Sequence, residues 1–324
     1  MLITCRKILT NFVPNRTGHF PIRFLSSTIS KTEDEIIVEN RTSHVRLIGI
    51  NRPQKRNAIN RETALKLRRA FEDFDNDPEY RVAVLHGFGG TFCAGYDLEE
   101  LSNIDEITVE NLITPAPMVC MLYNNVFDCD FVKKFLLIDQ GPTWMLTSKP
   151  VIAAIDGYAV AGGFELALWC DLRVMETTAV MGVYCRRFGV PLIDGGTVRL
   201  SKLIGHSRAM DLILTGRGIN GKEAFDFGIA NRLVPVGTAL GQAFNLAQSL
   251  VKFPNECLRA DRRSAYYATF DSTSLDDALQ KEFEISKSIV AKEAISGAKR
   301  FKDGVGKHGK FVLDKIGYDV DVSV

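Results

Sequence analysis

Residues 149–176 read KPVIAAIDGYAVAGGFELALWCDLRVME and carry the pattern that decides the fold. The run PVIAAI predicts a short buried strand, and the apolar run FELALW, which follows Gly162 and Gly163, predicts a helix. The segment LRVME at 172–176 is again strand-like. A strand, a glycine turn, a helix and a second strand in this order predict an α/β architecture with parallel strands.

The segments before this stretch extend the same design. RVAVLHGF at 81–88 is a short apolar run that ends in glycines, which is typical of a buried strand followed by a tight loop. Residues 35–50 contain two partly alternating β-branched runs around a polar break, so we expect a hairpin there. Residues 63–74 have a helical period. The fold class is therefore α/β, and the folded domain opens near residue 35.

The second half of the chain is predicted to be mostly helical. Residues 206–215 and 222–227 have helical periodicity, with glycines between them. Beyond Gly237 the pattern indicates a three-helix tail, which has no strands of its own and must pack on the core or on a neighbouring subunit. Residues 101–148 show weaker patterning, and we expect a mobile, partly helical excursion over a pocket.

Composition and charge exclude several classes of protein. The 324 residues are 46% hydrophobic, enough for one large core, and 40 basic residues nearly cancel 39 acidic ones. No long-range field would gather nucleic acid or an anionic membrane, and no apolar run is long enough to span a bilayer. The seven cysteines and five histidines lack the spacings of a disulfide framework or a metal site, so we expect reduced thiols and no metal.

The first 30 residues differ in composition from the rest. Basic residues alternate with Leu, Ile and Phe, and no acid precedes Glu33. This composition is typical of a mitochondrial transit peptide, so residues 1–30 predict delivery to the mitochondrial matrix. A disordered basic tail without a targeting role is the alternative.

Two glycine loops are candidates for binding an oxygen that gains negative charge. Gly95 lies in GGTFCAGYDLEEL at 89–101, where glycine allows the backbone to turn successive N–H groups toward a ligand. Gly162 and Gly163 directly precede a helix, whose first N–H groups are unpaired and whose dipole favours negative charge. Neither loop has the spacing of a phosphate loop or of GxGxxG, so nucleotide binding is not supported. A tight strand-to-helix turn is the alternative for each.

Glu165 is the candidate acid or base. It lies within the first helical turn after Gly162 and Gly163, among apolar residues, where loss of hydration disfavours the charge of a carboxylate. Such a group suits general acid or base catalysis. The alternative is an N-terminal acid that complements the helix dipole.

Three motifs in order resemble the crotonase (enoyl-CoA hydratase/isomerase) superfamily. They are FCAGYDL at 92–98, KPVIAAIDGYAVAGGFELALWCD at 149–171 and FGVPLIDGGTVRLSKLIG at 188–205, and the resemblance covers roughly residues 35–311. It implies a core of stacked, spiralling ββα units over 35–235 and a helical region over 236–324 that packs subunits into a homotrimer, or a hexamer made of two trimers. It also implies an acyl-CoA substrate, with coenzyme A as part of that substrate and no separate cofactor.

The resemblance also implies a set of site residues. The backbone N–H groups of Tyr96 and Gly162 would form the oxyanion hole, and Glu165 would position water or move a proton at the β-carbon. The substrate would be contacted by Lys55, Asn57, Ala58, Ala94, Gly95, Asp97 and Gly163.

One catalytic position departs from the family pattern. Hydratases of the family have a second glutamate about twenty residues after the first, and here that position is Cys185 in GVYCRRFGVP. Asp194 or Cys185 itself could supply the missing function, although Asp194 could instead cap the helix that follows. Arg186 and Arg187 could meet a substrate carboxylate, but structural ion pairs are the favoured interpretation.

The leading functional hypothesis is an acyl-CoA lyase. It would hydrate an enoyl-CoA or dehydrate the product, through a thioester enolate, in fatty-acid or branched-chain acyl-CoA metabolism such as β-oxidation. Isomerisation, decarboxylation or thioester hydrolysis on the same scaffold are the alternatives. A non-catalytic protein that binds acyl-CoA or RNA is a third, although Glu165 and the balanced charge argue against it.

Overall fold

The computed structural model describes residues 34–42, 44–103 and 141–306. The expected transit peptide at 1–30, most of the excursion at 101–148 and the end of the tail lie outside these ranges. We describe the unit that begins at Asp34.

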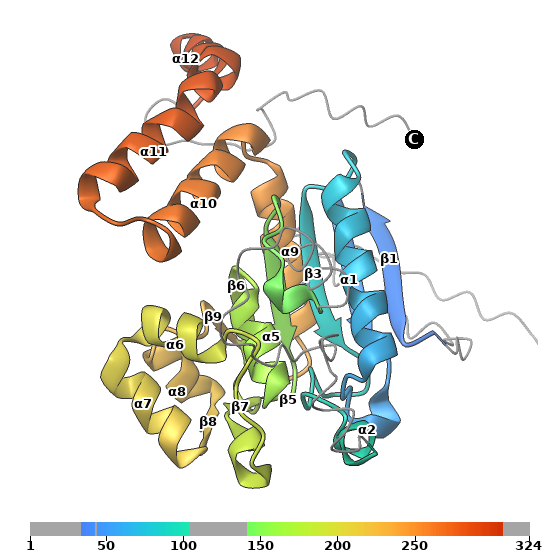
Figure 1. Ribbon diagram of the computed structural model, residues 1–324. Coiled ribbons are helices and arrows are strands. Elements are labelled where there is room, and N and C mark those ends of the chain that lie inside the picture. Colours follow the sequence, from blue (N-terminus) through green and yellow to red (C-terminus); the bar gives the residue numbers. More distant parts are fainter. Residues whose placement is uncertain (1–33, 43, 104–140, 307–324) are drawn as a thin grey trace, which may run out of the picture. The chain divides into compact units, whose positions relative to one another are not determined.

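A six-stranded sheet forms the centre of this unit (Figure 1). Its strands lie in the order β1-β2-β3-β4-β6-β9; β1 and β2 are antiparallel, and all later neighbours are parallel. The predictions of an opening hairpin and of an α/β fold with parallel strands are confirmed. The bounds are β1 Ile36–Thr42, β2 Val45–Ile50, β3 Val82–Gly87, β4 Val151–Ile155, β6 Leu172–Glu176 and β9 Arg232–Val234.

Side chains that alternate along the strands build a core on each face of the sheet. On β4, Val151 and Ala153 face the cluster that contains α1 (Arg61–Asn76) and α5 (Gly162–Trp169). Ile152 faces the other way, toward α9 (Ala239–Val251). This alternation follows from the two-residue period of a strand. Because both faces are buried, the central strands carry continuous apolar runs.

A second, three-stranded sheet lies beside the glycine turn. β5 (Tyr158–Val160) pairs in parallel with β7 (Val180–Gly182), which pairs antiparallel with β8 (Gly218–Asn220). β5 directly precedes α5, so this sheet fixes the chain just before the helix on which Glu165 lies. The shorter helices around it are α2 Leu98–Ser102, η1 Pro53–Lys55, η2 Pro142–Trp144, η3 Tyr184–Phe188, α6 Gly196–Ile204, α7 His206–Thr215 and α8 Gly221–Asp226.

The helical tail differs from the three-helix prediction. The described residues after Gly237 form four α-helices: α9 and then α10 Asn255–Phe270, α11 Leu275–Ile289 and α12 Ile295–Lys302, with a π-helical turn at Val290–Ala294. α9 packs on the sheet because Ala239, Ala243 and Ala247, four residues apart, present one small apolar face to it.

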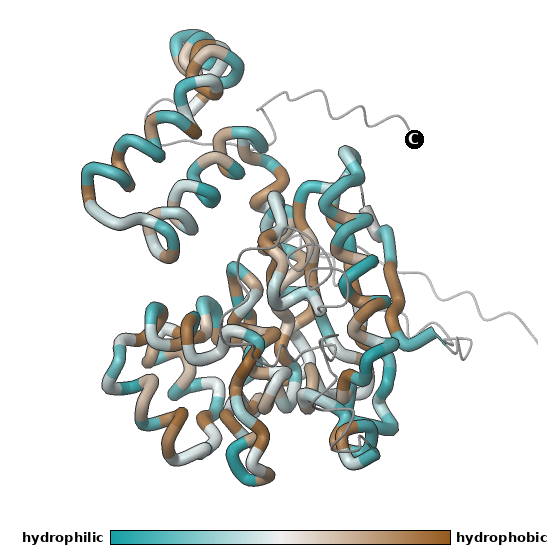
Figure 2. The backbone as a smooth tube through the Cα atoms, in the orientation of Figure 1, coloured by the Kyte–Doolittle hydropathy of each residue, from teal (hydrophilic) through white to brown (hydrophobic). Residues whose placement is uncertain are grey.

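α10 is joined to the core by polar contacts. Arg262 forms an ion pair with Asp171 at 2.8 Å, and the Tyr266 hydroxyl donates to the same carboxylate at 3.0 Å. α11 and α12 instead alternate hydrophobic and hydrophilic positions along the chain (Figure 2). Several of their apolar side chains are exposed, among them Leu275 and Phe283 on α11. Within the described ranges, none of the helices combines the length and apolar character needed to cross a bilayer.

Candidate active site

The two glycine loops are joined to each other by main-chain hydrogen bonds. Cys93 N donates to Tyr158 O at 2.9 Å, and Val160 N donates to Cys93 O at 3.0 Å. Gly163 permits this approach, because a Cβ at that position would lie 2.1 Å from Cys93 O. The sequence therefore needs glycine here for packing.

This junction brings together two main-chain N–H groups that have no hydrogen-bond acceptor within the described ranges. Among the described residues, neither the Tyr96 N–H nor the Gly162 N–H donates a hydrogen bond. They are neighbours, since a Cβ on Gly95 would lie 2.8 Å from the Gly162 nitrogen. Ala161, with φ 56°, sets the direction of the Gly162 N–H in a conformation that costs about 1–3 kcal/mol in a residue with a Cβ. Such strain is typical of functional sites.

The carboxyl group of Glu165 is buried and held by main-chain amides. Its Oε1 accepts from Asp194 N at 3.0 Å and from Gly196 N at 2.8 Å, and the residue is 2% exposed. Gly196 is the first residue of α6, so the N-terminus of that helix receives the carboxylate. Burial raises the pKa of Glu165, while these hydrogen bonds act in the opposite direction. Glu165 is therefore oriented rather than buried without partners.

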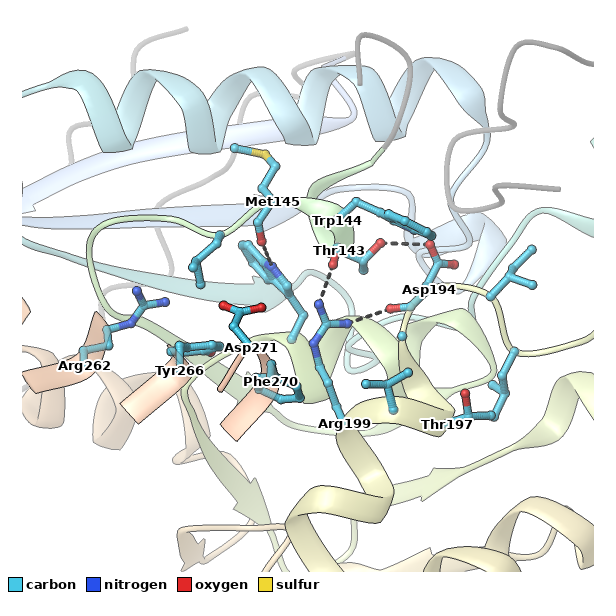
Figure 3. Close-up of a pocket in the computed structure, with 16 residues that line it drawn as sticks. Thr143, Trp144, Met145, Asp194, Thr197, Arg199, Arg262, Tyr266, Phe270 and Asp271 are labelled. Atoms are coloured by element: carbon cyan, nitrogen blue, oxygen red, sulfur yellow. Dashed lines mark hydrogen bonds between the residues drawn. The ribbon is translucent and has the colours of Figure 1, made fainter. Parts of the chain in front are cut away.

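Asp194 lies next to Glu165 and is equally buried. Its Oδ1 accepts from the Thr143 hydroxyl at 2.8 Å (Figure 3). The expectation that Asp194 caps the following helix is wrong, because Gly195 occupies the N-cap and no side chain bonds there. Burial, and then the negative charge of Glu165, raise the pKa of Asp194 well above its usual value.

Arg199 supports this segment without forming an ion pair with either carboxylate. Its guanidinium donates to Asp194 O at 2.7 Å and to Thr143 O at 2.6 Å. Both acceptors are main-chain carbonyls, as Figure 3 shows. Arg199 therefore holds the backbone of the loop in place. The Asp194 carboxyl group accepts its hydrogen bond from Thr143 and not from Arg199.

A cavity of about 310 Å³ collects most of the predicted site residues. The residues that carry the two unpartnered N–H groups and the two buried carboxyl groups all line it. The predicted residues that line it are Ala58, Ala94, Tyr96, Gly162, Glu165, Cys185 and Asp194. Its remaining lining consists of Arg56 and of residues that were not predicted, Leu98, Val160, Ala161, Tyr184, Phe188, Val190, Pro191 and Ile193.

The other predicted substrate contacts do not line this cavity. Lys55 pairs with Glu99 on the surface, and Asp97 pairs with Arg52 at 3.1 Å. The Asn57 side chain is buried and donates to the carbonyls of the first glycine loop. Gly95 and Gly163 lie behind the surface, where they allow close backbone approach.

Cys185 and the two arginines after it have different environments. Cys185 lines the cavity, and burial raises the pKa of its thiol to about 11. Arg186 donates to Ile213 O, and the Arg187 guanidinium lies 3.7 Å from the centre of the Tyr184 ring. Neither arginine pairs with a carboxylate in the described part of the chain, so the favoured prediction of structural ion pairs there is wrong.

Figure 3 shows a second, larger cavity of about 460 Å³. Ile193 and Asp194 line both. Its walls mix aliphatic, polar and charged residues with four aromatic ones, Trp144, Trp169, Tyr266 and Phe270. No cluster of metal-ligating side chains occurs in residues 34–42, 44–103 and 141–306.

Comparison with known proteins identifies the family. The model of the enoyl-CoA hydratase/isomerase family matches residues 40–133 and 142–306. A mevalonyl-coenzyme A hydratase of Aspergillus fumigatus is 28% identical over 254 residues, 78% of this chain and 86% of that protein. A probable enoyl-CoA hydratase of Mycobacterium leprae is 30% identical over 268 residues, 83% of this chain and 95% of that protein.

The fold agrees with this match. The crystal structure of an enoyl-CoA hydratase from Mycobacterium marinum aligns with a TM-score of 0.69 at 30% identity, over 83% of this chain and 96% of that one. The resemblance that the three motifs indicated is confirmed, and with it the crotonase-like α/β core followed by a helical region. The chain belongs to the enoyl-CoA hydratase/isomerase family.

Proposed function

We propose that this enzyme is an enoyl-CoA hydratase, which adds water across the double bond of a 2-enoyl thioester in acyl-CoA metabolism. One observation carries the proposal. The Glu165 carboxylate is fixed by two main-chain amides in the same cavity onto which the unpartnered amides of Tyr96 and Gly162 open. A base that is already oriented thus lies beside a site for negative oxygen.

The two amides stabilise the enolate. When water attacks the β-carbon, the π electrons move toward the thioester oxygen, which gains negative charge. The Tyr96 and Gly162 N–H groups donate to that oxygen, and one such donor is typically worth about 3 kcal/mol. Glu165 accepts the proton that the attacking water loses. The coenzyme A part of the substrate would lie along the backbone of Ala58 and Ala94, with no separate cofactor.

Three other reactions use the same oxygen site. Double-bond isomerisation, decarboxylation of a carboxyacyl-CoA and thioester hydrolysis each place negative charge on a thioester oxygen. They are the second candidates because Cys185 occupies the position at which the family pattern has a second glutamate. Non-catalytic binding of acyl-CoA is the third.

Incubation of the purified enzyme with crotonyl-CoA tests the proposal. We expect the absorbance of the conjugated thioester to fall and 3-hydroxybutyryl-CoA to appear. Conversion of a 3-enoyl-CoA to the 2-enoyl-CoA, release of CO₂ from a carboxyacyl-CoA, or release of free thiol from an acyl-CoA, by an enzyme that does not hydrate crotonyl-CoA, would identify one of the alternatives. Tight binding of acyl-CoA with no turnover would contradict an enzymatic role.

We also propose that the enzyme assembles as a homotrimer or as a hexamer of two trimers. Exposed apolar side chains on α11 and α12 support this, because Leu275 is 73% and Phe283 is 69% exposed on the single chain. Light scattering on a sizing column should give three or six times the chain mass of 36.0 kDa. A mass equal to that of one chain would contradict it.

The basic, acid-free composition of residues 1–30 supports a location in the mitochondrial matrix. A reporter fused to residues 1–33 should be imported into mitochondria, and a reporter that stays in the cytosol would contradict this proposal.

A further inference from the structure

We propose that Asp194 is the second catalytic acid of this site, and that its neutral carboxyl group delivers the proton to the α-carbon of the substrate. This inference rests on the proposed hydration reaction. It assigns to Asp194 the role of proton donor that the second glutamate would have, because Cys185 at that glutamate's position carries only a thiol.

The placement of Asp194 meets the geometric requirement. The main-chain N–H of Asp194 donates to Glu165 Oε1 at 3.0 Å, so a hydrogen bond joins the two acidic residues directly. Both residues line the 310 Å³ cavity, together with the amides of Tyr96 and Gly162. Thr143 binds one oxygen, Oδ1, at 2.8 Å. The other oxygen, Oδ2, has no hydrogen-bond partner among the described residues, although Asp194 is only 2% exposed.

The hydrogen bonds of the two carboxyl groups favour ionisation of Glu165 and protonation of Asp194. Glu165 accepts from two main-chain amides, at 3.0 Å and 2.8 Å, which favour its ionised form. Asp194 accepts from one hydroxyl, and Arg199 donates to carbonyls rather than to the Asp194 carboxyl group. Two buried carboxylates this close cannot both ionise readily, so Glu165 ionises first and Asp194 keeps the proton. The raised pKa of Asp194 agrees with this assignment.

Other titratable groups that surround Asp194 do not reverse the order. The groups that contact it or line the two cavities with it are Arg56, Tyr96, Glu165, Tyr184, Cys185, Arg199, Arg262, Tyr266 and Asp271, and Cys93 lies close by. Arg262 is already paired with Asp171. Cys185 is the competing proton donor, but burial raises the pKa of its thiol to about 11, which makes it a much weaker acid than a carboxyl group.

The step balances with water as the only co-reactant. The oxygen of water bonds to the β-carbon, and its proton passes to Glu165. The enolate held by the two amides then collapses, and the α-carbon takes the proton of Asp194. Glu165 is left protonated and Asp194 ionised. Transfer of one proton from Glu165 to Asp194 restores the starting state.

Asp194→Asn in the full chain tests the assignment. Thr143 can still donate to the amide oxygen, so the fold and the melting temperature should hold, while kcat for crotonyl-CoA hydration should fall by about 10²–10⁴-fold. The wild-type rate should decline at high pH, as Asp194 loses its proton, and at low pH, as Glu165 gains one. The alkaline decline should disappear in Asp194→Asn. Incorporation of solvent deuterium at the α-carbon of 3-hydroxybutyryl-CoA should slow by a similar factor.

Matched variants separate the outcomes. Asp271→Asn makes the same change at an exposed residue of the second cavity, and its kcat should equal that of the wild type. Cys185→Ala should lose less activity than Asp194→Asn and should keep both limbs of the pH profile. Asp194→Asn with kcat near the wild-type value, or with an intact alkaline limb, would overturn the inference while Glu165 kept its role. A wild-type enzyme without hydratase activity would instead contradict the proposed function.

Discussion

Replacement of Glu165 by glutamine is expected to lower kcat for hydration of crotonyl-CoA by about 10²–10⁴-fold. Glutamine has nearly the same shape, and its carbonyl oxygen can still accept from the Asp194 and Gly196 amides. It cannot accept the proton of the attacking water. The amides of Tyr96 and Gly162 are unchanged, so KM should change little and the melting temperature should be kept. Steady-state kinetics and thermal unfolding of the two proteins measure these differences.

The same substitution at Glu176 provides a matched control. Glu176 is also 2% exposed, and its Oε1 accepts from a main-chain amide, that of Ala239, at 3.2 Å. It lies at the end of β6, outside the lining of the reaction cavity. Glu176→Gln should therefore keep the wild-type kcat. If Glu165→Gln kept it as well, Glu165 would not be the base.

The decline of the rate at low pH follows from the protonation state that Glu165 must have. Glu165 accepts a proton, so the reaction needs its ionised form, and activity falls as the pH drops through its pKa. Burial raises that pKa, so the decline should begin at a higher pH than for an ordinary glutamate. The residual rate of Glu165→Gln should lack this acid limb.

Replacement of Gly95 by alanine is expected to lower kcat/KM by about 10²–10³-fold, the loss typical of one oxyanion donor. The new Cβ would lie 2.8 Å from the Gly162 nitrogen and 2.8 Å from the Ala161 Cβ. The loop must then move, and the two amides no longer converge on one oxygen. Gly95 also has φ +96°, a conformation that costs alanine about 1–2 kcal/mol, so the melting temperature should fall too.

Gly90→Ala separates the two expected effects of Gly95→Ala, which are displacement of the two N–H groups and backbone strain at positive φ. Gly90 has φ +76° on the same loop, but a Cβ there meets no atom within 4 Å. It should therefore lower the melting temperature by a comparable amount and leave kcat/KM near the wild-type value. Equal losses of kcat/KM in both variants would mean that strain in the loop, rather than a blocked amide, accounts for the effect.

The sequence predicted the parts of the fold that depend on local patterns. The apolar runs at 81–88 and 149–157 became the central strands β3 and β4, and Gly162 begins a helix with Glu165 in its first turn. The exception is the tail, where the described residues after Gly237 form four α-helices and not three. The first of them, α9, packs on the sheet through an alanine stripe at residues 239, 243 and 247, as one of the two expected partners for the tail.

Features of the site that depend on distant contacts could not be predicted. Glu165 is 29 residues from the Asp194 amide that holds it, and Thr143 is 51 residues from the Asp194 carboxyl group. A threonine in a Pro-Thr-Trp turn belongs to no sequence pattern that predicts such a contact. Asp194 looked like a helix cap because it precedes the helix, but the cap position fell on Gly195, whose φ of +86° suits glycine. The Asp194 carboxyl group accepts from Thr143 instead, and its main-chain N–H donates to Glu165.

The main-chain nature of the donors at this site bears on how such an enzyme diverges. Main-chain N–H groups hold the Glu165 carboxylate and form the proposed site for the thioester oxygen. Two of these groups begin helices, Gly162 in α5 and Gly196 in α6. A peptide N–H survives almost every point mutation, because only proline removes it. Evolution can therefore exchange the acids and thiols around the reacting carbons without loss of the groups that stabilise the intermediate. New reactions of this scaffold are expected to arise by changes of proton donor.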